Sequence, residues 1–167
     1  KTSRYKQIHI NRQYQTSENN KTMINEIKSA ATWWASHLTE FVPQHQITEF
    51  KKNLEIELKE RYQGHWYESD ALRGSAYRAI ICDYVQTDPL LIKVAEECGI
   101  DMVCFNVSLP REVVCWINPG VVMIRKSVTN ILGKPAQMDY EIVYKKTVPV
   151  EERVSNRPTL VQQQIVA

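Results

Sequence analysis

The chain has 167 residues, of which 43% are hydrophobic and 24% are charged, a composition typical of a folded globular protein. The formal net charge of +2 predicts no strong attraction to nucleic acid or to an acidic membrane. No apolar run approaches the roughly 20 residues of a membrane-spanning helix, and the N-terminal residues lack the apolar stretch of a secretory signal. We therefore expect no membrane partner, no direct nucleic-acid partner, and a cytoplasmic or nuclear location.

The four cysteines, at positions 82, 98, 104 and 115, contain no C-x-x-C pair and lie within apolar stretches. None has a histidine at ligand spacing, so the pattern does not predict a zinc site or any other metal centre. Cysteine in apolar surroundings behaves as a small hydrophobic residue. We therefore expect reduced core cysteines in an intracellular protein, and no cofactor.

Two helices are predicted in the first half of the chain. Residues 1–21 are read as a polar, flexible extension, although Ile8 and Ile10 alternate with polar residues as in a short strand. A first helix over about 22–41 is indicated by apolar residues at intervals of three and four, namely Ile24, Ile27, Ala31, Trp34, Leu38 and Phe41. A second, over about 48–62 with Thr48 as its N-cap, carries the stripe Ile47, Phe50, Leu54, Leu58 and Tyr62.

Strands dominate the second half. A loop over 65–78 leads into a strand over about 77–84, whose apolar side chains on both faces predict a central position in a sheet. Helices over about 89–98 and 101–109 follow. Further strands are predicted at 112–117, 121–125 and 140–144, the first two joined by the turn Asn118-Pro119-Gly120.

This order of elements predicts an α+β fold in which helices pack on a small, largely antiparallel β-sheet. The predicted domain spans 22–146. Residues 147–167, with two prolines and a glutamine run, are interpreted as a C-terminal tail or linker.

No enzyme motif stands out. The chain lacks a glycine-rich phosphate loop, a nucleophile elbow and a metal-binding histidine pair. His65 is a conceivable base and Ser75 a conceivable nucleophile, but the sequence places no partner beside either. Catalytic residues are therefore not predicted, with the reservation that a site built from distant residues escapes this reasoning.

Trp116 is the most informative single residue. In the strand 112–117, Val113, Cys115 and Ile117 share one face, and Trp116 lies on the other. Spacing leaves two interpretations open, a second core layer or an exposed anchor for a protein partner. Tyr77 has the same ambiguity. Trp66 is expected to fill the core between helix and sheet, and Arg78 to form a surface salt bridge or a backbone hydrogen bond.

Three segments resemble the BTG/Tob antiproliferative family. RYQGHWYESDALRGSAYRAI (61–80) is similar to its first signature box, with Tyr-x-x-His-Trp followed by Gly-Ser-x-Tyr-Arg. TDPLLIKVAEECGI (87–100) and SLPREVVCWINP (108–119) are similar to the rest of the domain, including the Leu-Pro and Trp-Ile-x-Pro of the second box. The resemblance covers roughly residues 22–145.

The resemblance implies a non-catalytic adaptor that binds the Caf-type nuclease subunit of the CNOT deadenylase complex, promotes mRNA deadenylation or translational repression, and restrains proliferation. It places Tyr77, Asp88 and Trp116 at the positions that grip the nuclease, with Asn118 and Pro119 in the adjoining turn. Sequence-specific RNA-binding proteins are further candidate partners.

The chain departs from the family pattern near these positions. Glu68 and Ala71 stand where the loop usually has prolines, Ala76 replaces a glycine, Asn118 replaces an aspartate, and Gly120-Val121 replaces an aromatic-Glu pair. One extra residue separates Tyr77 from Asp88. The alternative is therefore a divergent, self-assembling module without tight nuclease binding. An enzyme or direct RNA binder is the third and least favoured reading.

Overall fold

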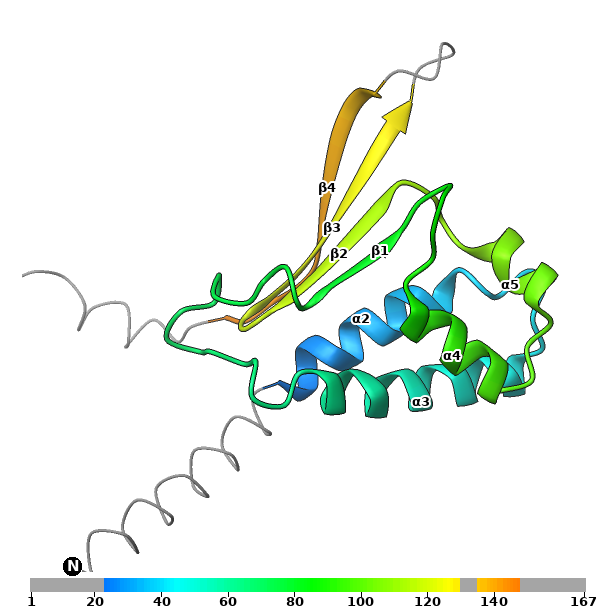
Figure 1. Cartoon of the computed structure of the whole chain (residues 1–167), viewed down its shortest axis with the longest axis horizontal. Coiled ribbons are helices and arrows are strands. Elements are labelled where there is room, and N and C mark those ends of the chain that lie inside the picture. Colours follow the sequence, from blue (N-terminus) through cyan, green and yellow to red (C-terminus); the bar gives the residue numbers. More distant parts are fainter. Residues whose placement is uncertain (1–22, 130–134, 148–167) are drawn as a thin grey trace, which may run out of the picture.

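The computed structural model describes residues 23–129 and 135–147 (Figure 1). In chain order its elements are helices α2 (Ile24–Ser36) and α3 (Gln44–Arg61), strand β1 (Ala79–Cys82), helices α4 (Pro89–Glu97) and α5 (Met102–Ser108), and strands β2 (Val113–Asn118), β3 (Val121–Thr129) and β4 (Pro135–Lys145). The predicted α+β class is confirmed.

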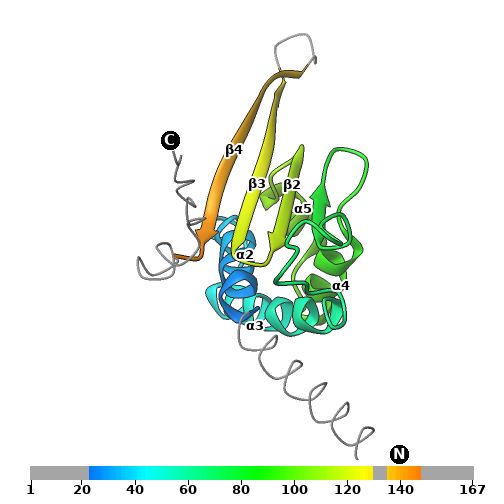
Figure 2. The same ribbon diagram turned by 90° about the vertical axis from the view of Figure 1, so that its left-hand side faces the viewer.

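The four strands form one antiparallel sheet in the order β1-β2-β3-β4. The helices gather on one side of it, and α2 packs against β2, β3 and β4 (Figures 1 and 2). Among the described residues no helix or strand covers the other side, which we call the open face of the sheet.

Side-chain alternation along the strands gives the two faces different roles. The helix-facing positions are apolar and almost fully buried, namely Ile80, Cys82, Val113, Cys115, Ile117, Val122 and Ile124. They meet the apolar stripes of α2 and α3 in a single core. The opposite positions, including Ile81, Trp116, Met123 and Ile142, lie on the open face.

The helical stripes are confirmed in most positions. All five residues of the second stripe are buried, as are Ile27, Ala31, Trp34 and Leu38 of the first. Ile24 and Phe41 were expected in the core but are exposed. Helix α2 ends at Ser36, earlier than predicted, where the backbone N–H groups of His37 and Leu38 bond to carbonyls three residues back instead of four.

The second helix begins earlier than predicted. Thr48 is not the N-cap, because its hydroxyl donates to the Gln44 carbonyl inside α3. Gln46, in the added first turn, reaches across to the end of α4, where its side-chain amide donates to the Gly99 carbonyl at 2.8 Å. The apolar stripe therefore did not reveal the first turn of α3, because Gln46, a polar residue that bonds to a distant segment, occupies a position where an apolar residue would have extended the stripe.

Two strand predictions are wrong. Strand β1 is an edge strand of four residues rather than a central one, and its Ile81 side chain is exposed. Strands β3 and β4 are much longer than 121–125 and 140–144 and form an extended hairpin, seen in Figure 1 running past the helical layer. Beyond Ile124 the described side chains, at 125–127 and 137–140, are half-buried or exposed on both faces, so the sequence there lacks the alternating apolar pattern of a half-buried strand.

The short strand considered at Ile8 and Ile10, the extension 1–21 and most of the tail 147–167 lie outside the described residues. The domain limits at 22 and 146 stay a prediction. Of the four cysteines, Cys82, Cys98 and Cys115 are buried as expected, whereas Cys104 is half-exposed.

Candidate partner-binding site

Asp88 lies at the start of helix α4 and is held by two interactions. One carboxylate oxygen accepts a hydrogen bond from the Leu90 backbone N–H at 3.0 Å, which caps the helix. Both carboxylate oxygens lie 3.2 Å from one nitrogen of Arg61, the last residue of α3. The Asp88 side chain is only 9% exposed and that of Arg61 27%, so this ion pair joins the two helices in partly desolvated surroundings.

Tyr77 projects beside this ion pair. Its ring stacks on the ring of His65 with centroids 4.1 Å apart, and the guanidinium of Arg61 lies 5.8 Å from the ring centroid. The side chain remains 44% exposed. Arg61 therefore connects Tyr77 and Asp88, two of the residues predicted to contact a partner, and His65 supports Tyr77 by stacking.

Trp116 lies in β2 on the open face of the sheet and is half-buried. Its cross-strand neighbours are Ala79 of β1 and Met123 of β3, and the guanidinium of Arg125 lies 5.4 Å from its ring. Ala79 is only two residues beyond Tyr77. The strand register thus places Trp116 next to the start of the edge strand that Tyr77 precedes.

Arg78 organises the loop that carries Tyr77. Its side chain is fully buried, and all five guanidinium N–H groups are used. They donate at 2.6–3.0 Å to the carbonyls of His65, Ala71, Arg73 and Ile117 and to the side-chain oxygen of Asn118. The backbone hydrogen bonds expected for Arg78 are confirmed, but at a buried position rather than on the surface.

Asn118 completes this network and is 5% exposed. Its amide nitrogen donates to the Ser75 hydroxyl at 3.0 Å while its oxygen accepts from Arg78. An aspartate at this position, as in the family pattern, could accept hydrogen bonds from both Arg78 and the Ser75 hydroxyl but could not donate to Ser75. The half-buried Pro119 follows, over a small pocket lined also by Trp66 and Glu68. The Asn118 side chain is thus occupied inside the domain, and direct partner contact by Asn118 and Pro119 stays a prediction.

Reasoning from the sequence missed Arg61 and underestimated Arg78. Arg61 carried no local signal, because its partner Asp88 is 27 residues away. Arg78 did carry one, since it stands at the entrance of an apolar strand, where a charged side chain needs buried acceptors. Trp66 is 6% exposed and stacks with Tyr62, which confirms its expected place in the core.

A family model described as the BTG family matches residues 23–133, two thirds of the chain and all the site residues above. The chain belongs to the BTG family. The resemblance seen in the sequence boxes is confirmed, and the matched range ends inside the segment between β3 and β4.

Curated relatives agree with this assignment. A BTG family protein of Dictyostelium discoideum is 37% identical over 107 residues, human protein Tob1 32% over 94 residues, and human protein BTG1 30% over 106 residues. These matches cover 62%, 56% and 62% of this chain, but only 25%, 27% and 61% of the respective relatives. The chain therefore corresponds to a part of each relative.

The solved BTG/Tob domain of C. elegans FOG-3, a variant with two substitutions, superposes on 79% of this BTG chain and 96% of its own with a TM-score of 0.61. At 17% sequence identity this likeness supports the fold. Within the described residues of the BTG chain, no helix has the length and apolarity needed to cross a membrane.

Proposed function

We propose that this BTG domain is a non-catalytic adaptor that binds the Caf-type nuclease subunit of the CNOT deadenylase complex through Tyr77, Asp88 and Trp116. Membership of the BTG family supports an antiproliferative adaptor role. Nuclease binding would link that role to mRNA deadenylation and translational repression. The resemblance of the two signature boxes supports the choice of this partner.

The observation that carries the proposal is the shared framework of the three residues. Arg61 contacts both Tyr77 and Asp88, and the strand register sets Trp116 against Ala79, two residues after Tyr77. Exposed aromatic side chains held in fixed orientations are the usual anchors of protein interfaces, because they bury much area at a small loss of conformational freedom. Here stacking on His65 and cation–π contacts supply that rigidity.

The test is calorimetric titration of a purified Caf-type nuclease subunit into the chain and three variants. Trp116→Ala and Tyr77→Ala should each weaken binding by about 2 kcal/mol or more, because each removes an interface anchor. Asp88→Asn keeps an N-cap oxygen for Leu90 but removes the charge that pairs with Arg61, so reduced binding by this variant would reflect the Asp88 charge and its ion pair rather than loss of the helix cap.

Phe41→Ala is the matched control, since Phe41 is an exposed aromatic residue, 46% accessible, just before α3 and therefore at the opposite end of that helix from Arg61. Circular dichroism and thermal unfolding should show that every variant is folded. A folded parent chain that fails to bind the nuclease, or a Trp116→Ala variant that binds as tightly as the parent, would contradict the proposal.

Self-association is the second candidate function, and the open face of the sheet favours it. Met138, Tyr140 and Ile142 of β4 are exposed there beside Met123 and Trp116, and exposed apolar patches of this kind commonly bind protein. Sedimentation velocity over a range of concentrations tests this function. Association that Ile142→Lys abolishes would support it, and a monomer at all concentrations would exclude it.

A further inference from the structure

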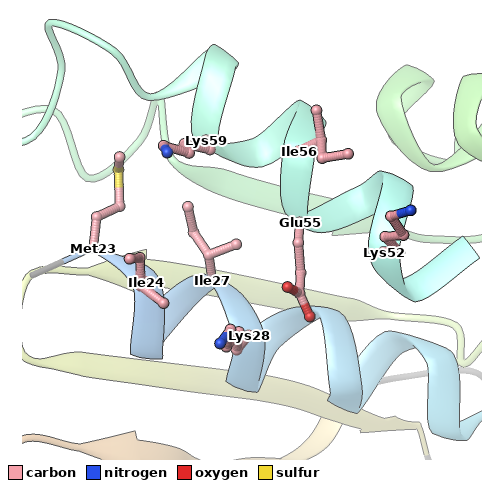
Figure 3. A pocket seen from close by; sticks show the side chains of 8 residues that line it. All are labelled: Met23, Ile24, Ile27, Lys28, Lys52, Glu55, Ile56 and Lys59. Carbon is pink, nitrogen blue, oxygen red and sulfur yellow. The ribbon is translucent and has the colours of Figure 1, made fainter. Parts of the chain in front are cut away.

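A groove of about 300 Å³ runs between the N-terminal half of α2 and the C-terminal half of α3 (Figure 3). Its apolar side chains are Met23, Ile24 and Ile27 from the α2 side and Ile56 from α3. Helix α3 packs on α2 along this flank and on α4 along another. The groove is therefore separate from the Arg61–Asp88 pair, which joins α3 to α4.

Two isoleucines of the groove, Ile24 and Ile56, do not pack in the hydrophobic core. Ile56 lies off the buried stripe of α3 and is 47% exposed, and Ile24 is 37% exposed. A surface helix normally carries polar residues at such positions. Both side chains flank the buried Ile27, so together they offer a continuous apolar strip in a concave surface rather than scattered exposed residues.

The rim of the groove is positively charged. Lys28, Lys52 and Lys59 line it, against the single carboxylate of Glu55 (Figure 3). Within the described residues none of the three ammonium groups forms a salt bridge, whereas Lys93 and Lys126 do so elsewhere in the domain. Unpaired lysines around an apolar strip are complementary to an acidic ligand with an apolar face.

The segment that precedes the groove is unsuited to fill it. Residues 1–22 lead directly into Met23 and contain five basic residues against one acidic residue, Glu18. Such a segment would place like charges beside the rim lysines. It would instead add to the positive potential that attracts an acidic partner.

We infer that the α2–α3 groove is a second docking site of this domain and that it binds an acidic amphipathic helix of another protein. Leucine-like residues at i, i+4 and i+7 would pack on Ile24, Ile27 and Ile56, as in other helix-in-groove complexes. Glutamate or aspartate residues on the flanks of that helix would face Lys28, Lys52 and Lys59. The inference does not depend on nuclease binding at Tyr77, Asp88 and Trp116.

The probe is a stapled helical peptide of about 15 residues, long enough to span the groove, with leucines at that spacing and glutamates on both flanks. A second peptide carries lysine at each glutamate position. Both are titrated into the full chain with isoleucine methyl groups labelled for NMR. The acidic peptide should shift the Ile24, Ile27 and Ile56 methyl signals and bind with a Kd of about 100 µM or tighter. The basic peptide should bind at least tenfold more weakly.

Variants locate the effect. Ile56→Asp should weaken binding of the acidic peptide at least tenfold, and Ile142→Asp, an exposed isoleucine of β4, should leave it unchanged. Lys28→Glu, at an exposed helix position that tolerates either charge, should weaken it about fivefold, while Arg73→Glu in the loop should not. If Ile56→Asp fails to fold, the comparison of Lys28→Glu with Arg73→Glu still tests the inference.

Three outcomes of the peptide titrations would overturn the inference. They are no binding of the acidic peptide up to about 1 mM, equal binding of the two peptides, and methyl shifts centred outside the groove. A single-stranded RNA or an anionic phosphatidylserine vesicle that shifts Ile24 and Ile56 at lower concentration than the peptide would also overturn it and assign the groove to that ligand.

Discussion

At the scale of single residues, Arg78 determines the shape of the candidate site. Burial lowers the pKa of its guanidinium, yet the group stays charged because arginine starts from so high a value. The charge is compensated by five acceptors, four of them backbone carbonyls. Those carbonyls belong to the loop before Tyr77 and to the end of β2, so one side chain holds together both signature boxes.

Replacing Arg78 with lysine keeps the positive charge but should still destabilise the domain strongly. Lysine has three N–H donors on a single nitrogen and cannot bond to all five acceptors of Arg78, so some buried carbonyls would lose their hydrogen-bond partners. We expect a loss of about 3 kcal/mol in the free energy of unfolding, measured by urea denaturation. Arg73→Lys, an exposed change in the same loop, is the control. Equal stability of the two variants would show that the network contributes little.

At the scale of elements, Glu26 ties helix α2 to the turn between β2 and β3. One of its carboxylate oxygens accepts a hydrogen bond from the Gly120 backbone N–H at 2.9 Å, and the other is buried without a partner among the described residues. Burial raises the pKa of Glu26 above its ordinary value of 4.5, although backbone hydrogen bonds and the charge of Lys146 act in the opposite direction.

A raised pKa in the folded state means that the folded protein binds this proton more tightly than the unfolded chain does. The contribution of Glu26 to stability is then largest below about pH 4.5 and declines as the pH rises through the folded-state pKa. Measured from pH 4.5 to pH 8, the parent chain should lose stability relative to Glu26→Gln. The exposed Glu40→Gln should show no such trend. A difference that is constant or grows in favour of the parent with pH would contradict this account.

The elements that could be predicted from sequence are those with one buried face. Leu54 and Leu58 fixed the period of α3, and Val113, Cys115 and Ile117 fixed that of β2. The ends of elements and the hairpin beyond Ile124 could not be predicted, because their residues face solvent or make polar contacts with distant segments. The Gln46–Gly99 bond is one such contact, 53 residues apart.

At the scale of the whole molecule, a two-layer domain has only one core. The helices and the inner face of the sheet share it, and Cys115 is completely buried there. The fold class followed from the order of elements, and the site residues followed from the family boxes. The Arg61–Asp88 ion pair and the His65–Tyr77 stack hold these residues in place. Their partners are 27 and 12 residues apart in the sequence, so hydrophobic periodicity could not predict them.

Cys115 should report opening of this core. Burial raises the pKa of its thiol to about 12, so reactive thiolate is scarce and the sulfur is shielded. We expect iodoacetamide to modify the half-exposed Cys104 in the native protein and Cys115 only when the domain unfolds globally. Mass spectrometry of digested samples at increasing urea concentrations measures both rates. Similar rates without urea would show that the core opens locally.

The Arg78 network also constrains the order in which the chain matures. Its bonds to Ile117 and Asn118 join residues 39 and 40 positions apart, so the loop bearing Tyr77 lacks two of its five tethers until β2 has been synthesised and paired with β1. A chain emerging from the ribosome can form α2 and α3 from local contacts well before that point. The surface proposed to meet the nuclease is thus assembled late, and a nascent chain halted before Ile117 would carry both helices but an unfinished docking surface.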